Sequence, residues 1–251
     1  MASSPAQQFV KENGFYRRVG LGLAGFALAA FAIVNIGGYT NIFAMPRATH
    51  IHAIVMVAWV ALFAVQNIIG AGANIALHRK LGWAGIVLAT AVIITGLATQ
   101  IATLSAGRVP PIFDPGYFLA LGVVNMTLFG GFITAAIINR KRTDWHRRLM
   151  LGSFIVFLEP VLGRAMLVIT TLAGMDNSPG ATPPPPIVIE MLRFVPHLLI
   201  VGAIVLRDRT IRGSVHPALW WVLAAVLVSY GATNLLGYSA PFQELAASLV
   251  P

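Results

Sequence analysis

The segment Ile187–Leu206 reads IVIEMLRFVPHLLIVGAIVL and has the length and apolar character of a membrane-spanning helix. About 20 residues of helix cross the hydrocarbon core of a bilayer. Two charges and a histidine interrupt the segment. Glu190, Arg193 and His197 stand at positions i, i+3 and i+7, so a helix places them on one face. Because ionisable groups are costly at membrane depth, this face is expected to point into the protein. The segment therefore predicts a bundle of transmembrane helices with a polar interior.

The composition of the whole chain is that of a polytopic membrane protein. Of its 251 residues, 57% are hydrophobic and 10% are charged, with a mean hydropathy of +0.80. Soluble globular domains have about 25% charged residues. The chain has no cysteine, which excludes disulfides, thiolate metal sites and cysteine nucleophiles. We predict an all-α membrane protein with a single transmembrane domain over residues 1–251 and seven transmembrane helices. The expected spans are about 16–37, 50–71, 83–103, 117–138, 149–172, 187–206 and 216–237.

The basic residues are distributed unevenly among the connections. The net charge of +9 is of the size found in nucleic-acid binders, but 13 of the 17 basic residues lie in the N-terminal segment and in alternate loops. This is the positive-inside pattern. We therefore predict a multi-pass protein of the bacterial cytoplasmic (inner) membrane, with its N-terminus inside and its C-terminus outside. Its partners are expected to be membrane lipids rather than nucleic acid.

A short basic motif recurs at the start of the expected spans. His78-Arg79-Lys80-Leu81 and His146-Arg147-Arg148-Leu149 are 68 positions apart, and His216-Pro217-Ala218-Leu219 is a weaker echo. The chain is thus expected to consist of one helix plus three hairpins in parallel repeat. We predict that the motif side chains contact lipid phosphates at the inner interface, although a site of three histidines is an alternative. These residues are His78, Arg79, Lys80, His146, Arg147, Arg148 and His216.

A second charged segment complements the first. Glu159, Pro160 and Arg164 lie within the expected span 149–172, and proline frees the carbonyl four residues earlier. If the segments 50–71, 149–172 and 187–206 are neighbours, their polar side chains line a cavity open to the periplasm. The predicted cavity residues are His52, Glu159, Arg164, Glu190, Arg193 and His197. In this interpretation the two arginines receive an anionic group, while Glu159 and His197 relay a proton.

Other interpretations of the same residues stay open. The four charges can satisfy each other as two ion pairs, Glu159 with Arg193 and Glu190 with Arg164. His52 and His197 are candidate ligands of a b-type haem. A divalent metal held by His50, His52, His197 and Glu159 is a further hypothesis.

Two stretches of the chain resemble a known family. Thr49-His50-Ile51-His52 with the following motif at His78, and Asp144-Trp145-His146-Arg147-Arg148 with the later Gly163-Arg164, are similar to a family of uncharacterised bacterial multi-pass integral-membrane proteins. This resemblance covers about the second to fifth spans and implies fold and location rather than activity. The histidines near helix ends resemble, more loosely, those of multi-helix b-type cytochromes.

These observations predict a membrane protein that binds a small molecule, cofactor or ion in the polar cavity. One alternative is a non-catalytic accessory subunit of a larger membrane complex, whose partners would be other membrane-protein subunits. Another is an enzyme, a membrane oxidoreductase that depends on haem or a metal. The chain has no Gly-rich phosphate loop and no zinc-protease motif, so its sequence names no reaction.

Overall fold

The computed structural model describes residues 5–70, 72, 74–110, 112–175 and 185–250, and every regular element in these ranges is helical. The all-α prediction is therefore confirmed for the described part of the chain. A single 3-10 turn, Ile42–Ala44, follows the first helix. The α-helices are α1 (Pro5–Ile36), α2 (Arg47–Gly70), α3 (Ile75–Ser105), α4 (Pro115–Ile138), α5 (Thr143–Ile155), α6 (Leu158–Leu172), α7 (Pro186–Arg212), α8 (Pro217–Gly237) and α9 (Ala240–Leu249).

Five of these helices are long and apolar enough to cross a membrane: α1, α2, α3, α4 and α8. The successive helices α5 and α6 form a sixth candidate if they are taken together. The predicted span 187–206 lies on α7, which is not among the candidates in the described residues.

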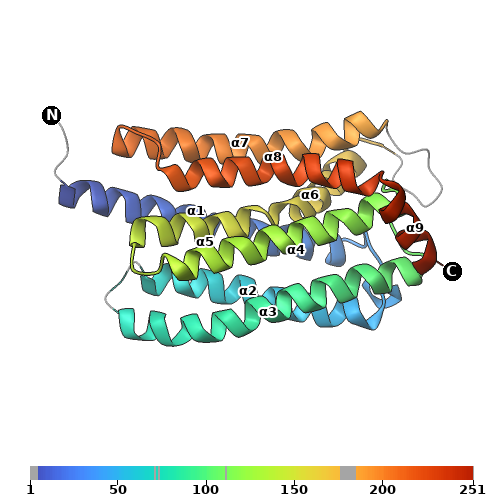
Figure 1. Cartoon of the computed structure of the whole chain (residues 1–251), viewed down its shortest axis with the longest axis horizontal. Coiled ribbons are helices and arrows are strands. Elements are labelled where there is room, and N and C mark those ends of the chain that lie inside the picture. The colour runs from blue at the N-terminus through green and yellow to red at the C-terminus, as the bar shows by residue number, and fades with distance from the viewer. Residues whose placement is uncertain (1–4, 71, 73, 111, 176–184, 251) are drawn as a thin grey trace.

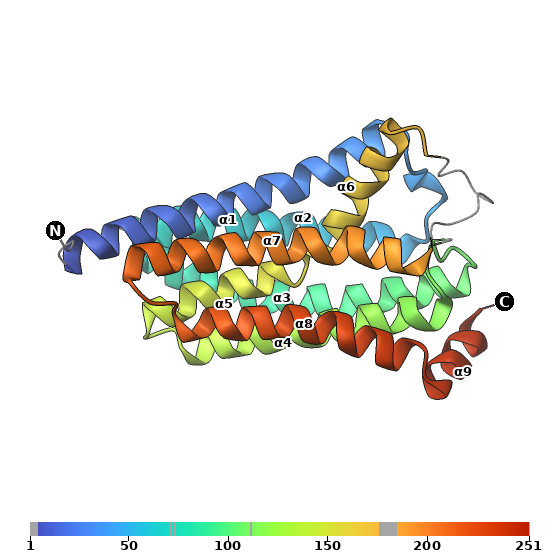
Figure 2. The same ribbon diagram turned by 90° about the horizontal axis from the view of Figure 1, so that it is seen from above.

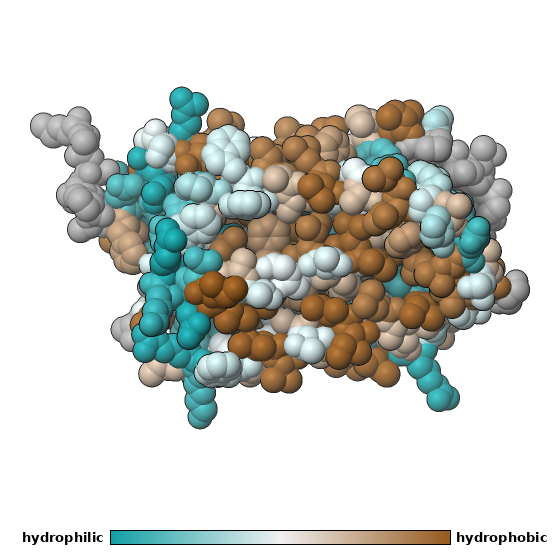
Figure 3. Space-filling view, viewed as in Figure 1, coloured by the Kyte–Doolittle hydropathy of each residue, from teal (hydrophilic) through white to brown (hydrophobic). Residues whose placement is uncertain are grey.

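The long helices run along a common axis, and the two ends of the chain lie at opposite ends of the bundle (Figure 1). One end carries the starts of α1, α3 and α5 and the end of α7 (Figure 1). We call it the basic end, because the clustered basic residues lie there, and we call the other the distal end. Hydrophilic residues gather at the basic end, whereas hydrophobic residues dominate the middle of the visible face (Figure 3). This distribution is typical of a protein surrounded by lipid.

Several helices extend beyond the predicted spans at the basic end. The predicted span 83–103 begins too late, because α3 starts at Ile75, where the side chain of Asn74 accepts a hydrogen bond from the Leu77 amide at 3.0 Å. The motif around His146 likewise lies in the first turns of α5, and the polar residues before Tyr16 continue α1. The first amide groups of a helix have no carbonyl partner within it, and an asparagine side chain before the helix can accept a hydrogen bond from one of them. The basic motifs are therefore helical and not loops.

The predicted span 149–172 is broken. Helix α5 ends at Ile155, and α6 starts at Leu158 after a bend of 44°. Pro160 has no amide hydrogen to donate to the Val156 carbonyl, and its ring crowds that carbonyl, so the regular helix cannot continue there. Figure 2 shows α6 leaving the line of α5 and running toward the distal part of α1.

The three predicted hairpins correspond to neighbouring helices: α2 packs on α3, α4 on α5, and α7 on α8. Helix α2 packs mainly on α1 and α3, whereas α7 packs on α6, α8 and α1. The segments 50–71, 149–172 and 187–206 therefore do not line one common cavity. Instead α4 and α8, which pack closely on each other, stand next to the charged parts of α6 and α7.

Candidate functional site

A network of charged and phenolic groups lies in the distal half of the bundle. The Arg193 Nε on α7 donates to the Glu159 Oε1 on α6 at 2.5 Å. Its Nη1 donates to the Tyr117 hydroxyl on α4 at 3.0 Å, and that hydroxyl donates to the Glu190 Oε1 at 2.5 Å. Arg193 Nη1 also lies 3.6 Å from the same Glu190 oxygen. One guanidinium thus joins α4, α6 and α7.

The predicted pair of Glu159 with Arg193 is confirmed, and both side chains are buried, with 6% and 4% of their surfaces exposed. The predicted pair of Glu190 with Arg164 is wrong, because Glu190 bonds Tyr117 and Arg193 instead. The network therefore contains two carboxylates and one guanidinium. Removing one partner of such a buried pair leaves an uncompensated charge, which costs about 3–5 kcal/mol.

His197 connects α7 to the break between α5 and α6. Its Nε2 lies 2.9 Å from the backbone carbonyl of Ile155, the last residue of α5. In a continuous helix this carbonyl would accept the amide hydrogen of Glu159. Because a carbonyl only accepts, Nε2 must carry the hydrogen and the neutral ring presents Nδ1 as an acceptor. Among the described residues, Nδ1 has no hydrogen-bond partner.

Unpaired polar atoms gather where α7 meets α8. They are the Arg193 Nη2, the His197 Nδ1, the Tyr230 hydroxyl and the Thr233 hydroxyl, none of which has a partner in the described ranges. All four residues are more than nine-tenths buried. The Tyr230 ring centre lies 5.6 Å from the Arg193 Cζ and 6.1 Å from the His197 ring centre. We call Arg193, His197, Tyr230 and Thr233 the α7–α8 seam. Buried polar atoms are normally paired, so this concentration favours a bound molecule or water.

A small hollow at the distal end leads to the same arginine. Asp114, at the start of α4, accepts hydrogen bonds from the Gly116 and Tyr117 amides and so holds the rim of this hollow in place. Glu190 is partly exposed, and Tyr238 is largely exposed. The hollow is lined by Ile112, Phe113, Asp114, Tyr117, Glu190, Arg193 and Tyr238.

Two residues of the predicted cavity lie elsewhere. The His52 Nδ1 is 3.0 Å from the Thr95 hydroxyl at the contact of α2 and α3. Arg164 is exposed, its guanidinium lies over the Phe31 ring of α1, and its Nη1 donates to the Pro160 carbonyl at 3.4 Å. The physical reason is the bend before α6, which brings Arg164 to the Phe31 ring of α1. The structure thus brings together Glu159, Glu190, Arg193 and His197, but not His52 and Arg164.

The histidines proposed as haem or metal ligands do not converge. His50 bonds the Pro46 carbonyl of its own helix at 3.2 Å, while His52 and His197 bond groups on α3 and α5. Within the part of the chain that the structure describes, no group of three or more His, Asp or Glu side chains is placed to hold a metal ion.

A second buried network ties the helices at the basic end. Asp208 on α7 accepts from the Tyr16 hydroxyl at 2.7 Å, from the His216 amide at 2.9 Å and from Arg148. Arg148 Nη2 and Arg212 Nη1 donate to the two oxygens of Glu12 at 3.2 and 3.0 Å, and Arg147 pairs with the same carboxylate. Arg148 and Asp208 have no exposed surface.

This network corrects part of the predicted lipid contact. Arg148 and His216 are buried, so they cannot face lipid phosphates, and Arg147 pairs with Glu12. His216 accepts the Ala218 amide at Nδ1 and donates from Nε2 to Asp144 at 3.0 Å. The ring centres of His78 and His146 lie 6.2 Å apart. Arg79 and Lys80 are exposed, and their lipid contact stays a prediction.

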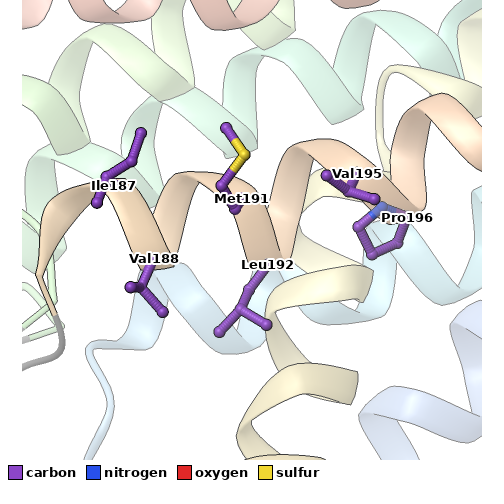
Figure 4. A pocket seen from close by; sticks show the side chains of 6 residues that line it. All are labelled: Ile187, Val188, Met191, Leu192, Val195 and Pro196. Carbon is purple, nitrogen blue, oxygen red and sulfur yellow. The ribbon is translucent and has the colours of Figure 1, made fainter.

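The other face of α7 carries a shallow apolar groove. Figure 4 shows its lining side chains, which all project from the distal half of this helix. They contribute no polar atom, so the groove offers no fixed orientation to a polar ligand. The lining residues are Ile187, Val188, Met191, Leu192, Val195 and Pro196.

Sequence patterns alone missed several residues that the structure makes central. Tyr117 and Tyr230 stand near predicted span ends and within an apolar span, where tyrosines are common without a polar partner. Glu12 and Asp208 stand among basic residues just outside the predicted spans, where an acidic side chain gives no signal of burial. The only available signal was rarity, since the chain has eight acidic residues in all. Comparisons with protein-family models, characterised proteins and solved structures give no match for this chain, so the geometry alone carries the functional argument.

Proposed function

We propose that this protein crosses a membrane seven times, with α7 as the additional span, and binds a small polar molecule or ion between α4, α6, α7 and α8. The basic end would face the cytoplasm, and the ligand would enter from the distal end. The observation that carries the proposal is the α7–α8 seam, where four buried side chains have polar atoms without a partner in the described part of the chain, beside a buried ion pair.

The hydrogen bonds that orient Arg193 and His197 support a binding role for the seam in addition to helix packing. Glu159 and Tyr117 hold Arg193 through Nε and Nη1, and Nη2 has no partner among the residues that the structure describes. The Ile155 carbonyl holds His197 in one tautomer. A binding site needs such side chains, oriented by neighbours and with some hydrogen-bonding capacity unused.

The substitution Tyr230→Phe tests this proposal, because it removes one unpaired hydroxyl and keeps the ring. If a molecule occupies the seam, the variant should lose it and unfold at a lower temperature. The measurements are thermal unfolding in mild detergent and mass spectrometry of small molecules released on denaturation. Tyr39→Phe, outside the bundle helices, is the control.

The second candidate is a non-catalytic accessory subunit of a larger membrane complex. The buried Glu159–Arg193 pair favours it, because the pair by itself gives these charges a structural role. In that case Tyr230→Phe would match or exceed the stability of the wild type, since burying an unpaired hydroxyl is unfavourable. If the variant and the wild type release the same molecules in equal amounts, that result would argue against a ligand at the seam.

A further inference from the structure

We infer that the α7–α8 seam accepts a small neutral molecule that both donates and accepts hydrogen bonds, as amides and alcohols do. The inference rests on the proposed function, because it names the class of ligand for that same site. It follows from the hydrogen-bonding capacity that the four side chains leave unused and from the charge around them.

The acceptor in the seam is His197. The Ile155 carbonyl, 2.9 Å from Nε2, can only accept a hydrogen bond. The hydrogen of the neutral ring is therefore on Nε2, and Nδ1 has a lone pair. Since His197 is 1% exposed and Nδ1 has no partner in the described residues, a ligand at this atom must donate.

The donor in the seam is Arg193. Its Nε and Nη1 are engaged by Glu159 and Tyr117, whereas Nη2 has no partner within the described ranges. A guanidinium only donates, so a ligand at Nη2 must accept. Tyr230 lies beside both residues and its hydroxyl can do either. A ligand that contacts both Arg193 Nη2 and His197 Nδ1 must therefore both accept and donate hydrogen bonds.

The lining of the seam disfavours both kinds of ion, an anion because of charge and a cation because of the group that it would meet. Arg193 is already paired with two carboxylates, Glu159 and Glu190, so an anion at its Nη2 would place a third negative group beside one guanidinium. A cation would find Arg193 Nη2, a positive group that cannot accept. A neutral ligand with both kinds of hydrogen-bonding group avoids the two penalties.

Three probes with the same heavy-atom shape separate these classes. Acetamide is neutral with a donor and an acceptor, acetate is an anion that only accepts, and acetamidinium is a cation that only donates. Each is added at up to about 100 mM, since ligands of a few atoms bind weakly. The thermal midpoint of the whole protein in detergent is then compared with sodium chloride controls at pH 7.5.

We expect a saturable rise of the midpoint with acetamide alone. Tyr230→Phe and His197→Phe should each raise the half-saturating concentration about tenfold or more, while Tyr39→Phe leaves it unchanged. His197→Gln, whose amide both donates and accepts, should restore part of the response. A shift with acetate or acetamidinium instead would overturn the neutral class but leave the binding function standing. The absence of a shift with all three probes would also overturn the neutral class. The binding function is judged separately, by mass spectrometry of the molecules that the wild type releases.

Discussion

At the scale of single residues, His216 shows how one side chain can serve a helix end and respond to pH. It accepts the Ala218 amide at the start of α8 and lies among buried charges of the basic end. Burial lowers the pKa of His216 below its ordinary value of 6.5, with the bond to Asp144 partly opposing that change. The folded protein therefore resists a proton that the unfolded chain binds.

Acidification through this range should destabilise the protein. As the pH falls below about 6.5, the unfolded chain is protonated first, so the free energy of unfolding decreases by at most about 1.4 kcal/mol per pH unit for this group. His216→Asn keeps a side chain that caps helices well but cannot titrate. We expect a flatter dependence of thermal stability on pH between 7.5 and 5.5 in this variant. An unchanged slope would contradict the role of His216.

The residue scale also includes the fully buried pair of Arg148 and Asp208. Asp208→Asn removes one of the two carboxylates that Arg148 faces while keeping a side chain of similar shape. We expect a loss of about 3–5 kcal/mol of stability, measured by denaturant or thermal unfolding in detergent. The exposed substitution Arg140→Gln, in the same half of the molecule, should change it by less than about 0.5 kcal/mol. Equal stabilities of the two variants would show that the basic-end network contributes little.

At the scale of elements, the break between α5 and α6 depends on two residues that are far apart in the sequence. Pro160 interrupts the helix, and His197 from α7 donates to the Ile155 carbonyl at that break. The proline alone would leave a buried acceptor without a partner. The bend then carries Arg164 toward α1 and leaves Glu159 facing Arg193.

A double-mutant cycle tests this coupling. His197→Phe should cost about 1–3 kcal/mol, because it leaves the Ile155 carbonyl unpaired. Pro160→Ala lets the helix close, so the Glu159 amide can donate to that carbonyl. We therefore expect His197→Phe to cost less in the Pro160→Ala background, by more than the roughly 0.5 kcal/mol within which independent sites add. If the changes in unfolding free energy of the two substitutions simply add, His197 and Pro160 are not coupled.

At the scale of the whole molecule, the two buried networks lie at opposite ends of the bundle and both involve α7. Arg193 joins α4, α6 and α7 in the distal half, while Asp208 joins α1, α5 and α7 at the basic end. Arg148 and Asp208 at the basic end have no exposed surface, whereas the hollow at the distal end reaches Glu190 and Arg193. A ligand of the seam would therefore enter from the distal side.

The absence of cysteine makes the orientation directly testable. Ser248→Cys on α9 and Lys141→Cys near the start of α5 place single thiols at exposed positions of the two ends. With seven crossings and the N-terminus inside, a membrane-impermeant maleimide should label Ser248→Cys in intact cells and Lys141→Cys only after lysis. Labelling of both positions from the same side would require an even number of crossings between Lys141 and Ser248 and would contradict the predicted three.

The sequence by itself determined the helical class, the apolar segments, the uneven basic charge and the shared face of Glu190, Arg193 and His197. Hydropathy and helical periodicity are local properties, so they can be read along one segment. The pair of Glu159 with Arg193 was also within reach, because opposite charges at membrane depth have few partners to choose from.

Only the tertiary structure decided which helices surround those charges. Tyr117 and Tyr230 enter the site because α4 and α8 pack beside α6 and α7, whereas α2 takes His52 toward α3. Arg148 is buried for the same kind of reason, since α1 and α7 bring Glu12 and Asp208 to it from distant parts of the chain. Helix neighbours are set by side-chain packing between segments far apart in sequence, and no periodicity within one helix encodes its partner.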